Sequence, residues 1–196
     1  MIGLLGLGLG YTRLAVQPQP TLPQASNPAA NPSPAPSSLP TSNAQPNFAV
    51  DTNGLSVAVA TLQTNQGTIK FRFYPLDAPQ TVKRMAQLIQ GGFYNQLLFH
   101  RVIPGFVAQT GDPNGNGTGG SGQKLPAEFN SRKHVEGTVA MARGADRDSA
   151  DSQFYISLGT HPHLDQSYTV FGQVMEGMDV AKRLHPGDKI VSLTIQ

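Results

Sequence analysis

Cysteine is absent from the 196 residues, and charged residues make up only 13% of them. Without cysteine the chain cannot form disulfides, use a thiolate nucleophile or hold zinc or an iron–sulfur cluster through sulfur. It has no apolar run of 18 residues, so we expect no complete transmembrane helix. It has no run of lysine and arginine either, and the net charge is +2. The composition therefore gives no indication of a nucleic-acid-binding surface.

The shortage of charge is confined to the N-terminal part of the chain. Arg13 is the only charged residue among the first 50, and nine of the 16 prolines lie between Pro18 and Pro46. A segment of this composition cannot bury enough apolar surface to fold, so residues 17–53 are predicted to be a disordered linker rich in Pro, Gln, Asn and Ser. We expect it to act as an extended spacer. Its PxxP-like spacing allows an alternative, a ligand for a proline-binding module.

Residues 1–16 form a separate apolar segment, in which Met1–Leu9 resembles the apolar part of a secretory signal or a remnant of one. No basic residue precedes it and no clear cleavage motif follows it, so a short disordered N-terminus is the alternative. Together with the uncharged linker, the segment favours an exported protein, either periplasmic or anchored to a membrane of the cell envelope. A cytoplasmic location is the alternative.

Residues 54–196 are predicted to form one domain. Leu55–Gln63 and Thr68–Tyr74 alternate in hydropathy on either side of a turn and predict a β-hairpin. Asp77–Gln90 has an apolar stripe at helical spacing and predicts a helix capped by Asp77. Further strands are expected at 98–103, 106–110, 138–142, 154–158, 169–174 and 190–195, and a short helix at 178–184. Many short strands with two helices favour an antiparallel barrel or sandwich.

Several short motifs lack a feature that the site they suggest would need. The G-x-G-x-x-G pattern at 115–120 has no helix after it to bind a pyrophosphate. The acidic residues at 146–151 lack the glycine and the acidic twelfth ligand of a calcium loop. His161 and His163 lack a separate third ligand for a metal. No G-x-S-x-G motif supports a serine hydrolase.

A longer pattern is far more specific. It consists of FHRVIPGFVAQTGDP (99–113), NGNGTGGSG (114–122), PAEF (126–129), GTVAMARGADRDSADSQFYI (137–156) and HLDQSYTVFGQV (163–174). In order and spacing these segments resemble the cyclophilin family of peptidyl-prolyl cis–trans isomerases, and its bacterial branch in particular. The resemblance implies a closed eight-stranded antiparallel β-barrel with two capping α-helices. It also implies a monomeric enzyme without cofactor or metal that acts on proline-containing polypeptides and assists their folding.

The resemblance assigns catalytic roles to three residues: Arg101 as the family's catalytic arginine, Gln109 as the glutamine that helps to hold it, and Phe106 as part of the proline pocket. It assigns substrate binding to Val107, Ala142, Arg143, Gln153, Tyr155, His163, Leu164 and Tyr168. Ordinary structural roles, an exposed strand arginine or a barrel-core aromatic residue, are the alternatives.

Three of these positions depart from the commoner family pattern. His163 stands where cyclosporin-sensitive members have tryptophan, so we expect weak cyclosporin binding. Tyr168 replaces a histidine at the pocket edge, and Val107 replaces a methionine. His100, on the other face of the Arg101 strand, is expected to be a core histidine with satisfied hydrogen bonds.

The chemistry of X–Pro isomerisation suits these residue types. Delocalisation of the prolyl nitrogen lone pair creates a barrier of ~20 kcal/mol. At the twisted transition state the nitrogen regains its lone pair, and a fixed cationic donor stabilises that state more than either planar state. The rival interpretation is a cyclophilin-like module that binds proline peptides with little turnover. A weaker one makes the proline-rich tail the functional interaction element.

Overall fold

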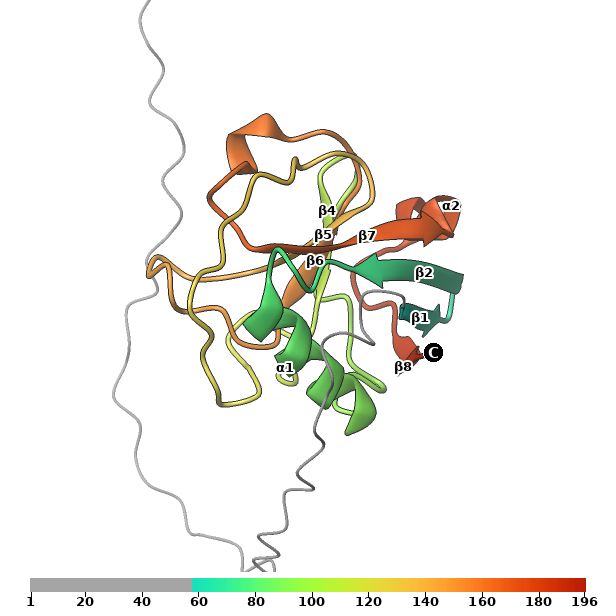
Figure 1. Cartoon of the computed structure of the whole chain (residues 1–196). Coiled ribbons are helices and arrows are strands. Elements are labelled where there is room, and N and C mark those ends of the chain that lie inside the picture. The colour runs from blue at the N-terminus through green and yellow to red at the C-terminus, as the bar shows by residue number, and fades with distance from the viewer. Residues whose placement is uncertain (1–57) are drawn as a thin grey trace, which may run out of the picture. The chain divides into compact units, whose positions relative to one another are not determined.

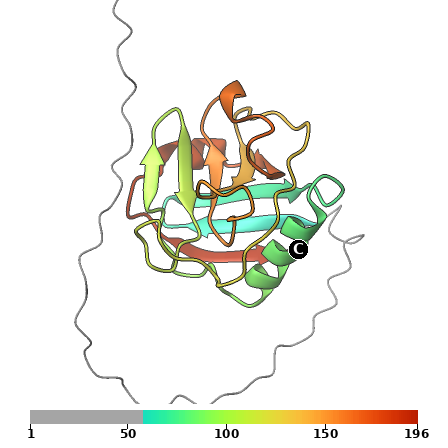
Figure 2. The same ribbon diagram turned by 90° about the vertical axis from the view of Figure 1, so that its left-hand side faces the viewer.

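A computed structural model describes residues 58–196. The predicted apolar segment, the linker and the first residues of the predicted domain, 54–57, lie outside the described residues. The described part is mainly β, with two α-helices beside a strongly curved sheet (Figures 1 and 2). Within residues 58–196 no helix has the length and hydropathy needed to cross a bilayer.

Eight strands form the sheet, in the order β3-β4-β6-β5-β7-β2-β1-β8, and every neighbouring pair is antiparallel. Their bounds are β1 Val59–Thr64, β2 Gly67–Phe73, β3 Arg101–Ile103, β4 Val107–Thr110, β5 Thr138–Met141, β6 Phe154–Ser157, β7 Val170–Glu176 and β8 Ile190–Ile195. The helices are α1, Pro79–Gln90, and α2, Met178–Arg183, with a single 3-10 turn, η2, at Pro162–Leu164. The predicted hairpin is confirmed as β1 and β2, joined by a two-residue turn before Gly67.

The predicted closure of the barrel is wrong. The sheet is an open half-barrel whose edges are β3 and β8. No ladder joins β3 to β8; the segment just before β3 runs beside β8 instead. The two edges are linked there by an isolated bridge between Leu98 and Lys189 and by backbone bonds such as Phe99 N–H to Asp188 O, 2.8 Å.

The start of helix α1 also differs from the prediction. Asp77 does not cap it: the N-cap position is Ala78, and the Asp77 carboxylate instead accepts from the Arg132 guanidinium at 2.8 and 3.0 Å. The first free backbone N–H groups of the helix are satisfied from elsewhere in the chain. Glu128 accepts from the N–H groups of Gln80 and Thr81 at 2.9 and 2.8 Å. A carboxylate at this end of a helix also interacts favourably with the helix dipole.

Strand alternation divides the buried side chains into two clusters. Neighbouring residues of a strand point to opposite faces, so Phe154 and Ile156 of β6 enter the main core while Tyr155 points to the other face. There Tyr155 joins Val107, Ala140 and Val170 in a smaller cluster. Rigid strands thus present a small apolar surface away from the core.

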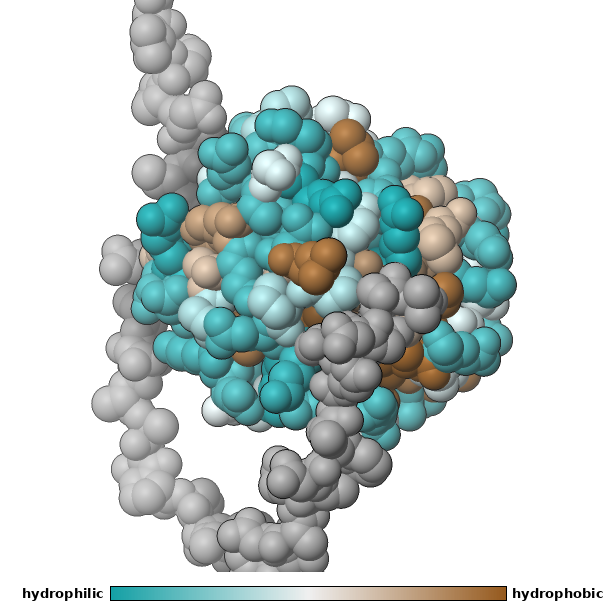
Figure 3. Space-filling model, in the orientation of Figure 1, coloured by the Kyte–Doolittle hydropathy of each residue, from teal (hydrophilic) through white to brown (hydrophobic). Residues whose placement is uncertain are grey.

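Elsewhere the exposed apolar side chains are isolated. Figure 3 shows one face of the molecule, where apolar patches lie apart among hydrophilic residues. Among the described residues, the large exposed hydrophobic side chains are Leu76, Ile103, Val135, Met175 and Val191. Single exposed apolar residues of this kind are normal on a protein surface.

Candidate active site

A cavity of about 210 Å³ lies on the smaller apolar cluster. Its lining consists of Arg101, Phe106, Val107, Gln109, Ala142, Arg143, Tyr155, Leu164 and Tyr168. All of these are residues that the sequence resemblance assigned to the site. Of the remaining two, Gln153 lines the neighbouring cavity, and His163 lines neither of the two.

Adjacent strands place a cation at the rim of this cavity. Arg101 on β3 lies opposite Gln109 on β4, which in turn lies opposite Tyr155 on β6. The Arg101 guanidinium donates from Nη1 to Gln109 Oε1 at 3.3 Å, and its carbon lies 5.6 Å from the centre of the Phe106 ring. The charge therefore stays exposed to solvent while it borders an apolar floor.

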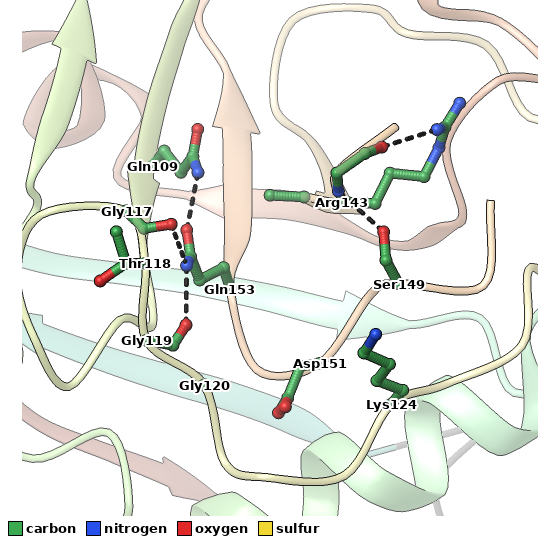
Figure 4. A pocket seen from close by; sticks show the side chains of 12 residues that line it. Gln109, Gly117, Thr118, Gly119, Gly120, Lys124, Arg143, Ser149, Asp151 and Gln153 are labelled. Carbon is green, nitrogen blue, oxygen red and sulfur yellow. Dashed lines mark hydrogen bonds between the residues drawn. The ribbon is translucent and has the colours of Figure 1, made fainter. Parts of the chain in front are cut away.

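The side-chain amides of Gln109 and Gln153 link Arg101 to the glycine-rich loop, residues 114–122. Figure 4 shows the part of this chain of hydrogen bonds from Gln109 to the loop. Gln109 Nε2 donates to Gln153 Oε1 at 3.0 Å, and Gln153 Nε2 donates to the carbonyl oxygens of Gly117 and Gly119 at 3.0 and 2.8 Å. Because a backbone carbonyl can only accept, the Gln153 amide has one allowed orientation. That orientation turns the Gln109 oxygen toward Arg101, so the loop backbone determines which atom the guanidinium meets.

A second cavity of about 380 Å³ adjoins the first, and Gln109, Ala142 and Arg143 line both. Its other lining residues are Gly117, Thr118, Gly119, Gly120, Lys124, Gly144, Ser149, Asp151 and Gln153 (Figure 4). The glycine-rich loop thus forms one side of this cavity.

The Arg143 side chain is held in place where it borders the two cavities. Its Nε donates to Ser167 O at 3.0 Å and its Nη1 to Gly144 O at 2.9 Å. The guanidinium carbon lies 4.9 Å from the centre of the Tyr168 ring. Arg143 therefore connects its own loop to the loop that carries Tyr168.

Two histidines of the η2 loop pack against Phe106. His161 Nε2 lies 3.0 Å from the Phe106 carbonyl oxygen, and the two rings meet edge to face. The His163 ring lies nearly parallel to the Phe106 ring, with 6.0 Å between centres. His163 thus supports the cavity floor from outside the cavity.

Sequence reasoning missed His134 and Asp165, which lie behind the cavity wall. The buried His134 ring lies between the Tyr155 hydroxyl and the Asp165 carboxylate. No local pattern marks them, since these contacts join residues far apart in the chain. Asp165 lies within the HLDQSYTVFGQV segment, but the resemblance gave it no role, and His134 lies between two of the quoted segments.

His100 is not the hydrogen-bonded core histidine that the sequence predicted. Both of its ring nitrogens are buried without a partner among the described residues. The nearby Asp112 carboxylate is already occupied by the backbone N–H groups of Asn114, Asn116 and Gly117. Burial lowers the pKa of His100, so the ring is neutral at pH 7.

The cavity combines an apolar floor with a guanidinium held at its rim. A cation fixed in this way is the kind of group that can stabilise a twisted X–Pro bond. Among residues 58–196 no group of three or more His, Cys, Asp or Glu side chains is placed to hold a metal ion.

Comparison with known proteins identifies the family. Residues 59–192 match the model of the family described as cyclophilin type peptidyl-prolyl cis-trans isomerase/CLD. A peptidyl-prolyl cis-trans isomerase of Synechococcus elongatus is 48% identical over 138 residues, which cover 69% of this chain and 94% of the relative. Peptidyl-prolyl cis-trans isomerase B of Bacillus subtilis is 44% identical over 130 residues, covering 65% and 90%. The chain belongs to the cyclophilin-type peptidyl-prolyl cis–trans isomerase family, and its activity is the isomerisation of X–Pro bonds.

Solved structures agree with this assignment. A cyclophilin-type isomerase of Cryptosporidium parvum superposes with a TM-score of 0.67 at 28% identity, covering 70% of this chain and 96% of that one. The same parasite protein has also been solved in the presence of the dipeptide Ala-Pro, and that structure superposes with a TM-score of 0.67 at 27% identity, covering 70% and 98%.

Proposed function

We propose that the 210 Å³ cavity receives the proline ring of the substrate and that Arg101 stabilises the twisted X–Pro bond. The observation that carries the proposal is the Arg101–Gln109 hydrogen bond at the rim of a cavity whose floor is the smaller apolar cluster. A guanidinium held in this way keeps N–H donors beside the pocket and needs less reorientation during the reaction. Preorganised donors of this kind act on the charge that develops in the transition state.

The rest of the substrate chain would lie across Ala142 and Arg143, because these residues border both cavities. The proline ring would occupy the smaller cavity, and a flanking side chain the larger one. The Ala-Pro dipeptide used with the Cryptosporidium parvum relative supports the choice of ligand. Phe106, Val107, Tyr155 and Leu164 would contact the ring, with Gln109 placed near the rotating carbonyl.

The test is the rate of cis-to-trans conversion of an Ala-Ala-Pro-Phe reporter peptide by the full chain and by Arg101→Ala. Loss of one preorganised donor typically costs about 10²–10³-fold in rate, and we expect a loss of this order in kcat/KM. Arg183→Ala is the matched control, because Arg183 is exposed and its one polar side-chain partner within residues 58–196 is Asp179. An Arg101→Ala variant with undiminished turnover would overturn the catalytic role. Tight binding with little turnover by the unaltered chain would favour the binding-module interpretation.

We further propose that the domain works as a monomer outside the cytoplasm, held away from a membrane or a partner by residues 17–53. The composition of residues 1–53 supports this: an apolar start is followed by a long, uncharged, proline-rich segment. Cell fractionation with sequencing of the mature N-terminus tests the location, and light scattering after size exclusion tests the monomer. Recovery in the cytoplasm with an intact N-terminus would contradict the proposal.

A further inference from the structure

A buried hydrogen-bonded relay stands behind the Tyr155 wall of the cavity. His134 Nε2 lies 3.1 Å from the Tyr155 hydroxyl, and His134 Nδ1 lies 3.2 Å from Asp165 Oδ1. The His134 side chain is 0% exposed, so solvent cannot replace either partner. The three residues come from the segment before β5, from β6 and from the loop after η2.

The chemistry of the three groups determines the direction of the relay. An ionised carboxylate can only accept, so the proton of the neutral imidazole resides on Nδ1 and is donated to Asp165. Nε2 is then an acceptor, and the Tyr155 hydroxyl donates to it. If the imidazole were protonated, Nε2 would become a donor to the hydroxyl oxygen, and the Tyr155 hydroxyl proton would be left without an acceptor among the described residues.

Asp165 anchors the relay to the other wall of the cavity. It follows directly after η2, which carries the cavity residue Leu164. Its carboxylate also accepts from the backbone N–H of His134 at 2.8 Å and from Lys133 Nζ at 3.1 Å. These bonds, that of the His134 backbone first, lower the pKa of Asp165, so it is ionised at neutral pH. Asp165 thus ties the Leu164 wall to the Tyr155 wall.

Tyr155 has no other polar partner to hold its ring among the described residues. The side chain is 5% exposed and meets Tyr168 edge to face, with 5.9 Å between ring centres. Its hydroxyl bonds to His134, and its ring forms part of the cavity surface. The relay therefore adds a polar contact that holds the ring within its apolar packing.

We propose that His134 and Asp165 are positioning residues of the proline pocket, which fix the Tyr155 ring through a relay that operates only while His134 is neutral. The inference rests on the proposed role of the cavity as the proline pocket. It makes substrate affinity sensitive to mild acid, although neither residue lines the cavity.

The surroundings of His134 define the direction of that sensitivity. The titratable and charged groups that face it are Lys133 beside it, Tyr155 on β6, and His161, His163, Asp165 and Tyr168 around η2. Burial lowers the pKa of His134; Asp165 opposes this and the charges of His161 and His163 reinforce it. The neutral relay is therefore complete at pH 7. As the pH falls below the usual histidine range, the Tyr155–His134 hydrogen bond reverses its direction and the hydroxyl proton loses its acceptor.

The experiment compares the full chain with Tyr155→Phe, which keeps the ring and removes only the hydroxyl. Binding of the Ala-Ala-Pro-Phe peptide is measured by NMR titration between about pH 8 and about pH 5, together with kcat and KM, while the imidazole signals report the pKa of each histidine. For the unaltered chain we expect Kd and KM to rise about fivefold toward acid, because the buried Tyr155 hydroxyl proton is left without its acceptor, with a midpoint that follows the pKa of His134. Tyr155→Phe should bind more weakly at pH 7 and lack this step.

Two further variants make the result decisive. His134→Gln should also lose the step, whereas His185→Gln should retain it, because His185 is exposed and far from the cavity lining. The proposal would be overturned by a rise in Kd and KM toward acid that persists in Tyr155→Phe, or by one whose midpoint follows the pKa of His161 or His163. If the unaltered chain failed to bind the peptide even at about pH 8, the proline pocket itself would be wrong. Binding without any pH step would instead reject only the relay.

Discussion

Gln109 lies directly opposite Arg101 in the β3–β4 ladder, and its side-chain oxygen accepts a hydrogen bond from the guanidinium at 3.3 Å. Gln153 determines which end of the Gln109 amide faces Arg101, since its own amide is oriented by two loop carbonyls. The position of the cation thus depends on residues of β3 and β4 and on Gln153, which directly precedes β6.

Replacing Gln109 by Leu tests this dependence. The variant keeps much of the side-chain volume but leaves Arg101 without its acceptor. Hydrogen bonds to charged groups are worth about 1.5–3 kcal/mol, so we expect kcat/KM to fall about 10- to 100-fold, mostly in kcat. Reporter kinetics give the two parameters separately. A change confined to KM would show that Gln109 binds substrate and does not orient Arg101.

Gln153→Glu tests the far end of the same chain of amides. A carboxylate cannot donate to the carbonyl oxygens of Gly117 and Gly119, so both would lose their donor and face a negative charge. We expect a loss of stability of about 1–3 kcal/mol together with lower kcat/KM. Thermal unfolding and reporter kinetics measure the two effects. Glu136→Gln serves as control, since Glu136 makes an exposed pair with Lys182. Unchanged kcat and KM in Gln153→Glu would show that the loop contact of Gln153 does not contribute to catalysis.

His163 leads to a prediction about a ligand. Its ring stacks on Phe106 from outside the cavity, at the position that the family resemblance connects with cyclosporin. Imidazole offers less apolar surface than indole, so the unaltered chain should bind cyclosporin weakly. His163→Trp should raise the affinity by about tenfold or more, because a large aromatic side chain with an N–H donor is added at the rim. Isothermal titration of both chains checks this, and equal affinities would contradict it.

Local pattern predicted most of the fold. The alternation in Thr68–Tyr74 and the apolar stripe of Asp77–Gln90 place β2 and α1 within a residue or two of their observed bounds. The face shared by residues two apart along a strand correctly separated Arg101 from His100. The curvature and edges of the sheet were not predictable in this way, because closure depends on how β3 meets β8 and not on either strand alone.

The resemblance likewise named the residues that line the cavity, but not those that support them. The contacts of His134 with Tyr155 and Asp165, and of Glu128 with the start of α1, join residues distant in sequence. Such pairs leave no periodic signal, and a polar residue in a loop has many possible partners. Asp77 was a reasonable cap by local rules, yet Arg132 holds its carboxylate.

The role of Glu128 can be measured through stability. Glu128→Ala leaves the N–H groups of Gln80 and Thr81 without their carboxylate acceptor. Loss of a helix cap typically costs about 0.5–2 kcal/mol, so the free energy of unfolding should fall by this amount. Asp77→Ala should cost less, because it removes an ion pair at the surface. Urea titration of both variants gives the comparison, and a larger loss in Asp77→Ala would show that Asp77 stabilises the helix start after all.

The hydrogen bonds of Asp112 lead to a prediction about the free energy of unfolding at low pH. Burial alone would raise the pKa of its carboxyl, but the backbone N–H groups of Asn114, Gly117, Asn116 and Gly119 outweigh burial and lower it. A folded-state pKa below the unfolded value of about 3.9 means that the unfolded chain binds the proton more readily. The stabilisation by Asp112 is therefore complete above that value and is lost as the pH falls through the folded pKa. Asp112→Asn should be less stable at pH 7 by about 1–3 kcal/mol, since its amide NH₂ must face backbone donors.

The variant should also respond less to acid. Without a carboxyl at this position, the free energy of unfolding should decline less steeply below about pH 4 than in the unaltered chain. Urea unfolding at several pH values measures the slope, and Glu176→Gln, an exposed partner of Lys70, is the control. The remaining slope should come largely from Asp165, Asp179 and Asp188, whose pKa values are also lowered. If Asp112→Asn kept the full slope, the backbone N–H groups of the 114–119 loop would not be stabilising an ionised carboxylate. The loop that orients Gln153, and through it Arg101, would then have to be held by its glycine-rich backbone alone.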